Sequence, residues 1–184
     1  MDVKDYRRAS HEVWEAMAPG WERWRAQLAH ALTSVRGWLI RELAPRSGET
    51  VLELGVGTGE TGFEVAALLG DDGRLISTGL SPDMVEVARR RGTELGLANV
   101  DYRVLDAERI GLDTGAVDGV LCQSTYMLVA DPSVALAETR RVLRPGGAWR
   151  SRYGCLRAQP VGLDRRDDPG RARPHPAPRA AGIR

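Results

Sequence analysis

The sequence has few of the residues that mark disulfide-rich, membrane or metal-binding proteins. Its 184 residues include two cysteines, Cys122 and Cys155, which are too few for a disulfide scaffold or a thiolate zinc site. No apolar run approaches the roughly 18 residues of a transmembrane helix, and the charged start shows no secretory signal. No His, Cys and carboxylate cluster has the spacing of metal ligands. We therefore expect a reduced, cytoplasmic, single-domain protein with no membrane partner.

Net charge is also small, but it is unevenly distributed. A formal net charge of +1 is too small to attract the whole chain strongly to nucleic acid. Residues 149–184, however, hold nine arginines, three aspartates and five of the ten prolines, without a periodic apolar pattern. Their net charge of +6 leaves −5 on residues 1–148. We expect this basic tail to be disordered, and its lack of aromatics after Tyr153 argues against a nucleic-acid partner.

What the sequence does contain is an alternation of apolar runs and helical patterns. Between residues 10 and 44, apolar residues recur at steps of three and four, which predicts amphipathic helices with a break at Pro19 and Gly20. Further along, strands are expected over residues 50–54, 73–78, 100–105 and 117–123, and helices over residues 61–69, 82–95 and 132–143. The turn at residues 144–147 should lead into a fifth strand. This alternation predicts a parallel sheet with helices on its faces.

A glycine cluster follows the first predicted strand. Residues 53–59 read Glu-Leu-Gly-Val-Gly-Thr-Gly and lead into a predicted helix. Such a loop places backbone N–H groups and the positive end of a helix beside a ligand, and glycine allows both the unusual dihedrals and the close approach. A tight turn without a ligand, or a dinucleotide site at residues 57–62, would also fit this loop alone.

The segments around this loop decide between these alternatives. Residues 51–59 closely resemble the first motif of class I S-adenosylmethionine-dependent methyltransferases. Four later segments resemble the same family in the correct order: residues 80–84, 106–108, 117–123 and 141–147. The dinucleotide alternative fits less well, because the acidic residue before the glycines and the Arg-Pro-Gly-Gly turn belong to the methyltransferase pattern. The nearest subgroup is similar to the small-molecule quinone-biosynthesis C-methyltransferases.

This resemblance covers about residues 45–148. It implies an α/β fold with a Rossmann-like parallel sheet and helices on both faces, S-adenosylmethionine as cofactor and a small-molecule methyl acceptor. We expect residues 1–47 to form helices on the acceptor side and residues 48–148 to form the cofactor-binding core. The basic tail would leave the sheet incomplete at its C-terminal side.

The resemblance also assigns roles around the loop. Gly55, Gly57 and Gly59 would wrap the methionine part of the cofactor. Glu53 would hold the loop through its N–H groups or bind the cofactor's ammonium, or it would brace the loop without touching a ligand. Leu80 belongs to the segment that follows the second strand.

The remaining implied site residues come from later in the chain. Asp106 would accept a hydrogen bond from the adenine amino group beside the Ala107 N–H, or would only cap a helix. Met84 would pack on the adenine, or in the core. Gln123 and Ser124 follow the fourth strand, where it opens towards the methyl group, although plain strand-end residues would look the same.

Two features depart from the family pattern, and the first is Gly79. The family usually has an acidic residue here, bonded to both ribose hydroxyls. A hydrogen bond to a charged group contributes roughly 1.5–3 kcal/mol, so we expect weak cofactor binding. Asp83 is near in sequence, but we do not expect it to substitute for the missing acid.

The second departure begins near residue 148. Residues 148–156 read Ala-Trp-Arg-Ser-Arg-Tyr-Gly-Cys-Leu, which is a poor sequence for a buried fifth strand. Shifting the frame to the third base of the Ala148 codon yields an apolar strand in its place. We hypothesise that the sequence runs out of frame from here, and a genuinely encoded basic tail is the alternative. If the reading frame is shifted, we expect the fourth strand to lie unpaired at a sheet edge.

No residue stands out as a general base. His11 and His30 lie in the N-terminal helices, and Tyr126 follows the fourth strand. The tryptophans at positions 14, 21 and 24 could line an acceptor pocket, although helical spacing equally suits core contacts. Cys122 in a buried strand suggests packing. Three hypotheses stay open: a small-molecule methyltransferase, a cofactor-binding pseudoenzyme or inactive truncated fragment, and, with least support, a basic nucleic-acid binder.

Overall fold

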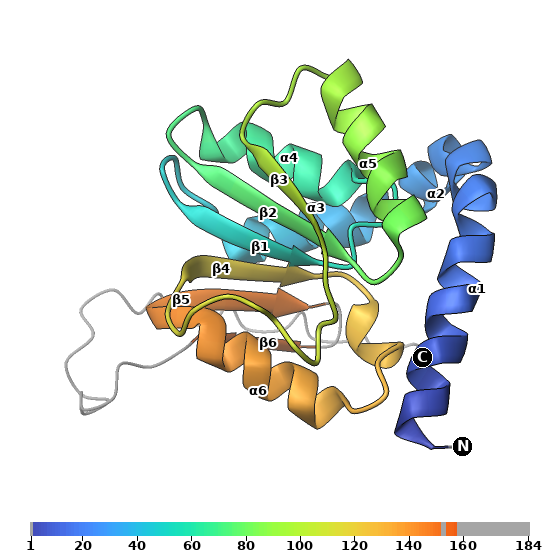
Figure 1. Ribbon diagram of the computed structural model, residues 1–184. Coiled ribbons are helices and arrows are strands. Elements are labelled where there is room, and N and C mark those ends of the chain that lie inside the picture. Colours follow the sequence, from blue (N-terminus) through green and yellow to red (C-terminus); the bar gives the residue numbers. More distant parts are fainter. Residues whose placement is uncertain (1, 152–153, 158–184) are drawn as a thin grey trace, which may run out of the picture.

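The computed structural model describes residues 2–151 and 154–157, and these form one sheet with helices on both faces (Figure 1). The six strands follow the order β3-β2-β1-β4-β5-β6. Their bounds are β1 Thr50–Leu54, β2 Arg74–Gly79, β3 Val100–Val104, β4 Val117–Cys122, β5 Leu143–Ser151 and β6 Gly154–Arg157. The first five strands are parallel, and β6 pairs antiparallel with β5. The predicted Rossmann-like α/β fold is confirmed.

Helices cover both faces of this sheet. Their bounds are α1 Val3–Arg23, α2 Arg25–Ala31, α3 Thr33–Leu43, α4 Glu60–Leu69, α5 Pro82–Glu94 and α6 Pro132–Val142, with a short 3-10 turn η1 at Thr125–Met127. One buried cluster joins α3 and α4 to the sheet through Leu39, Val65 and Val51. A second cluster joins α6 to the opposite face through Val142 and Leu52. The helix α1 crosses the end of the sheet and packs beside α5 (Figure 1).

Local chemistry explains where the core elements begin. The strand β1 is buried on both faces from Val51 to Leu54, as an apolar run in a central parallel strand should be. The helix α5 begins as predicted, with Pro82 in its first turn and the Ser81 hydroxyl accepting from the Met84 N–H at 3.1 Å. These elements fix the ends of β1 and β2, where the site lies.

The break predicted at Pro19 and Gly20 was wrong, because α1 runs through both residues to Arg23. Contacts on either side of Pro19 hold the helix. Glu15 accepts a hydrogen bond from the Ser81 hydroxyl at 2.6 Å, and Glu22 pairs with Arg90 at 2.9 Å. Proline in a helix interior costs about 3 kcal/mol, which tertiary contacts can offset. The chain bends instead at Trp24 and Leu32, between the helices.

The prediction that β4 would lie unpaired at a sheet edge was also wrong. β5 pairs with β4 up to Ser151, and β6 pairs with β5. The predicted turn at residues 144–147 lies inside β5 as an irregularity, where the register shifts between Val117 and Gly119. The sheet therefore continues past residue 148. The predicted disorder of the tail falls mainly on residues 158–184, which lie outside the described residues.

Candidate functional site: a pocket at the carboxyl ends of the strands

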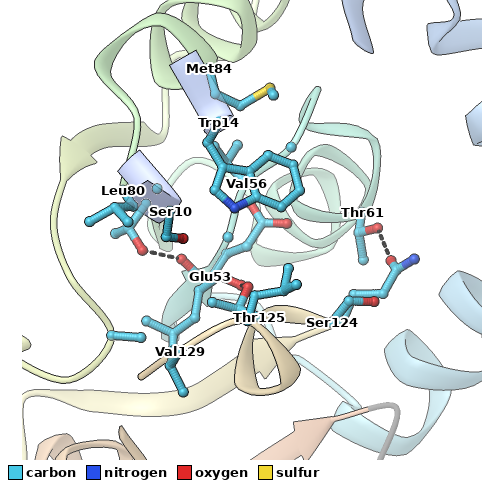
Figure 2. A pocket seen from close by; sticks show the side chains of 18 of the residues that line it. Ser10, Trp14, Glu53, Val56, Thr61, Leu80, Met84, Ser124, Thr125 and Val129 are labelled. Atoms are coloured by element: carbon cyan, nitrogen blue, oxygen red, sulfur yellow. Dashed lines mark hydrogen bonds between the residues drawn. The ribbon is translucent and has the colours of Figure 1, made fainter. Parts of the chain in front are cut away.

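One pocket opens where β1, β2, β3 and β4 end, and residues of α1 and α2 also line it. Figure 2 shows Trp14 of α1 beside side chains from these strand ends. Ligands of open α/β sheets bind at such an edge. Eight of the nine predicted site residues line this pocket: Glu53, Gly55, Gly57, Leu80, Met84, Asp106, Ala107 and Gln123. Only Gly59 is absent from the lining. Residues that lie far apart in the sequence are therefore brought to one place.

Positive backbone dihedrals and hydrogen bonds to β2 define the shape of the glycine loop. Gly55, Gly57 and Gly59 all have positive φ, at 80°, 54° and 96°. The Gly55 and Val56 N–H groups both donate to the Thr78 carbonyl, at 2.9 and 2.7 Å, so β2 holds the turn. A Cβ on Gly59 would overlap the Phe63 ring, and Gly59 caps α4. Gly59 therefore shapes the start of the helix.

Glu53 lies at the bottom of the pocket, with only 3% of its surface exposed. Its Oε2 accepts from the Ser77 hydroxyl at 2.6 Å, and its carboxylate also accepts from the Gly62 N–H in the first turn of α4. Burial raises the pKa of this carboxyl to about 7. The nearby charge of Glu60 also raises this pKa, and the two hydrogen bonds lower it. Glu53 thus braces the loop against α4 and also forms part of the pocket wall.

The turn after β3 presents a second carboxylate to the pocket. Asp106 Oδ1 accepts from the Glu108 N–H at 2.9 Å, and its segment forms a tight turn closed by a bridge to Arg109. The helix-cap alternative was therefore wrong, because no helix follows. Arg7 of α1 donates to Glu108 Oε2 at 2.8 Å and lies 3.6 Å from Asp106 Oδ2. This ion pair fastens α1 across the mouth of the pocket.

The end of β2 carries no carboxylate. Gly79 lines the pocket, and a Cβ built there would lie 3.2 Å from Val85 and 3.3 Å from Val56. Asp83 is exposed and does not line the pocket, so the structure agrees that it does not replace the missing acid. Met84 is buried to 4% exposure beside it and forms part of the apolar wall.

The end of β4 supplies polar side chains on the other side of the pocket. The Thr61 hydroxyl donates to Gln123 Oε1 at 2.8 Å, which orients the amide (Figure 2). Ser124 and Thr125 also line the pocket, and the Thr125 hydroxyl donates to the Leu54 carbonyl at 2.9 Å. Thr61 was missed from the sequence, since its partner lies 62 residues away.

The candidates for proton transfer named from the sequence lie elsewhere. Neither His11 nor His30 is among the residues that line the pocket. Tyr126 is buried, with its hydroxyl 2.7 Å from that of Thr139, and burial raises its pKa. Burial likewise raises the pKa of the Cys122 thiol to about 12, which agrees with a packing role.

The three N-terminal tryptophans divide into two groups. Trp14 and Trp21 line the pocket, with ring centroids 5.7 Å apart and an edge-on angle of 62°. Trp24 is 57% exposed. Leu28 and Leu32 continue the apolar wall beyond Trp21. Trp14 and Trp21 therefore face a cavity, and Trp24 faces solvent.

A parallel sheet with a glycine turn after β1 and a carboxylate after β3 defines a protein that binds a nucleotide-like cofactor at its strand ends. Comparison with known proteins narrows this class. The family described as "Methyltransferase domain" matches residues 51–147, more than half of the chain. The chain belongs to this family of S-adenosylmethionine-dependent methyltransferases.

Two curated relatives match parts of this chain, and the second is named as a methyltransferase. An uncharacterized 37.1 kDa protein in transposon TN4556 of Streptomyces fradiae is 39% identical over 142 residues, 76% of this chain and 41% of that protein. A ubiquinone biosynthesis O-methyltransferase of Xanthomonas oryzae is 39% identical over 69 residues, 37% of this chain and 28% of that enzyme. The chain thus spans less than half the length of these curated relatives.

A solved structure shows the same fold. A SAM-dependent methyltransferase from Aquifex aeolicus superposes with a TM-score of 0.59 and 25% identity, covering 63% of this chain and 62% of that one. Among the described residues, no helix combines the length and apolar character needed to cross a membrane.

Proposed function

We propose that this protein transfers the methyl group of S-adenosylmethionine to a small, largely apolar acceptor molecule. The observation that carries the proposal is that Gly57, Asp106 and Gln123 come from three different strand ends and line the same pocket. When bound, the cofactor supplies a methyl group activated by a sulfonium sulfur. The protein's own task is then to align the acceptor and to exclude water.

The residues present fit this cofactor at most points. Gly57 lets a ligand approach the loop backbone, and the remaining lone pairs of Asp106 could accept from an amino group. Met84 and Leu80 offer apolar surface for a flat base between these points. The end of β2 fits less well, because Gly79 has no side chain to bind ribose hydroxyls. We therefore propose that the cofactor binds weakly.

The acceptor would lie towards α1 and α2. Trp14, Leu28 and Leu32 make this side of the pocket apolar, while Gln123 and Ser124 add polar groups near the strand ends. No histidine lines the pocket within the described residues. An acceptor that is already nucleophilic, or that loses its proton to water, suits this site best. The acceptor atom itself, O, N or C, is not fixed by these residues.

Transfer of radiolabelled methyl groups into a mixture of small aromatic and apolar molecules tests this function. We expect label in the organic extract with the wild-type protein and none with Gly57→Val, whose side chain conflicts with the positive φ. Binding without transfer is the second candidate, which Gly79 favours. It predicts saturable cofactor binding and no labelled product with any acceptor.

A further inference from the structure

The helix α1 presents two aromatic rings to the pocket. Trp14 and Trp21 lie seven residues apart, on one face of the helix, and touch edge-on. Both rings line the pocket, while Ala18 between them is buried at 2% exposure. The two tryptophans therefore contribute their rings to a ligand site more than to the core.

Trp21 lies opposite the central glycine of the loop. A Cβ built on Gly57 would lie 3.6 Å from Cζ3 and 3.9 Å from Cε3 of Trp21, which is ordinary van der Waals contact. The missing side chain thus leaves a space about one atom thick between the loop backbone and the indole ring. A ligand group that occupies the place of this Cβ would therefore touch Trp21.

Carboxylates and arginines both line the pocket around this space. The carboxyl groups of Glu53 and Glu60 both line the pocket and lie near enough to influence each other. Glu60 accepts a hydrogen bond from the Thr58 hydroxyl and pairs with Arg25 at 3.2 Å, so its position is held and part of its charge is offset. Aromatic rings combined with carboxylates are the groups that recognise positively charged ligands.

We propose that Trp21 is a specificity residue that recognises the positive charge of the cofactor's sulfonium group through a cation–π contact. This inference rests on the proposed function. Transfer of the methyl group leaves the sulfur as an uncharged thioether, so the product S-adenosylhomocysteine loses this interaction. Trp21 therefore makes the pocket prefer the charged cofactor over its product and favours product release.

Calorimetric titration of four proteins with both ligands tests the proposal. The proteins are the wild type, Trp21→Leu, Trp21→Phe and the control Trp24→Leu, which changes an exposed tryptophan at the end of the same helix. Cation–π contacts correspond to roughly 2- to 30-fold in affinity. We expect Trp21→Leu to lower the affinity for both ligands, and to lower the affinity for S-adenosylmethionine roughly 2- to 30-fold more than that for S-adenosylhomocysteine. Trp21→Phe should keep part of the preference, and Trp24→Leu all of it.

The possible outcomes separate the inference from the function on which it rests. Equal weakening of both ligands by Trp21→Leu, or no change at all, would overturn the cation–π role while leaving the methyltransferase proposal intact. If the wild type binds neither ligand at millimolar concentration, the proposed function and this inference both fail. Circular dichroism would show whether Trp21→Leu is folded. If it is not, Trp21→Phe is compared with the wild type instead. A smaller preference of Trp21→Phe for S-adenosylmethionine supports the cation–π role, and an unchanged preference overturns it.

Discussion

Replacing Glu53 with glutamine should change how the stability of this protein depends on pH. Glu53 is 3% exposed, and burial raises the pKa of its carboxyl from 4.5 to about 7. Between these two values the folded protein keeps a proton that the unfolded chain has released. The stability that this proton provides is complete below about pH 4.5 and is lost as pH rises through 7.

The expected size follows from the same pKa values. Their difference corresponds to about 3 kcal/mol of unfolding free energy lost between acid and neutral pH. Glutamine cannot ionise, so Glu53→Gln should lack this loss. It should, however, pair less well with the two donors that face it, Ser77 and Gly62, at a cost of about 1 kcal/mol. The variant is thus expected to be less stable than the wild type near pH 4.5 and more stable near pH 8.

Urea unfolding at several pH values between 4.5 and 8 measures this crossing. The control is Glu64→Gln on the same helix that Glu53 braces, since that side chain is 52% exposed and its ion pair with Arg36 contributes little. Parallel stability curves for the wild type and Glu53→Gln would show that the buried carboxyl does not take up a proton on folding, and would refute the reasoning.

Three further changes test other parts of the structure. Gly79→Asp should tighten S-adenosylmethionine binding tens- to hundreds-fold in calorimetry, with Gly79→Ala as control, and a low-micromolar dissociation constant for the wild type would contradict the expected weakness. Arg150→Leu should raise the unfolding free energy by roughly 1–3 kcal/mol, because this arginine is 7% exposed and forms no ion pair with a carboxylate among the described residues; unchanged or lower stability would contradict this. Gly20→Ala should raise the melting temperature, gaining about 0.5–1 kcal/mol, since nothing lies within 4 Å of the added Cβ; a lower melting temperature would show that Gly20 is needed in α1.

Arg150 also bears on the hypothesis of a shifted reading frame, which we keep as a proposal. Arg150 Nε has no hydrogen-bond partner in the part of the chain that the structure describes, although Nη1 donates to the Trp149 carbonyl at 2.8 Å. A buried strand rarely carries such a side chain. The nucleotide sequence across codons 140–160 tests the proposal: an intact frame, with no apolar strand in the shifted one, would contradict it.

The strands and the site loop could be predicted because their signals are local. The apolar run of β1 and the Ser81 cap before Pro82 specify these elements from neighbouring residues alone. The closely spaced glycines of the loop likewise predict unusual dihedrals, and Gly57 has a φ of 54°. Local signals could not predict that α1 continues through Pro19. Glu15 and Glu22 hold the helix there through contacts with residues 66 and 68 positions away.

The polar contacts that complete the pocket also depend on distant residues. Arg7 meets Glu108 across 101 positions, so neither residue indicates the other in the sequence. The spacing of Trp14 and Trp21 predicts a shared helix face, but only the packing of α1 shows that this face covers a cavity. The strand β5 could not be predicted with its neighbours because its sequence is unfavourable for a buried strand. Its pairing with β4 and β6 nevertheless places Trp149 and Arg150 in the sheet.

Calorimetric titration of the wild type and Gly57→Val with S-adenosylmethionine tests the central claim most directly, with a melting curve to confirm that the variant folds. We predict saturable one-to-one binding by the wild type and its loss in a folded Gly57→Val protein. Absence of binding by the wild type, or equal binding by both proteins, would show that the pocket beside the glycine loop is not the cofactor site.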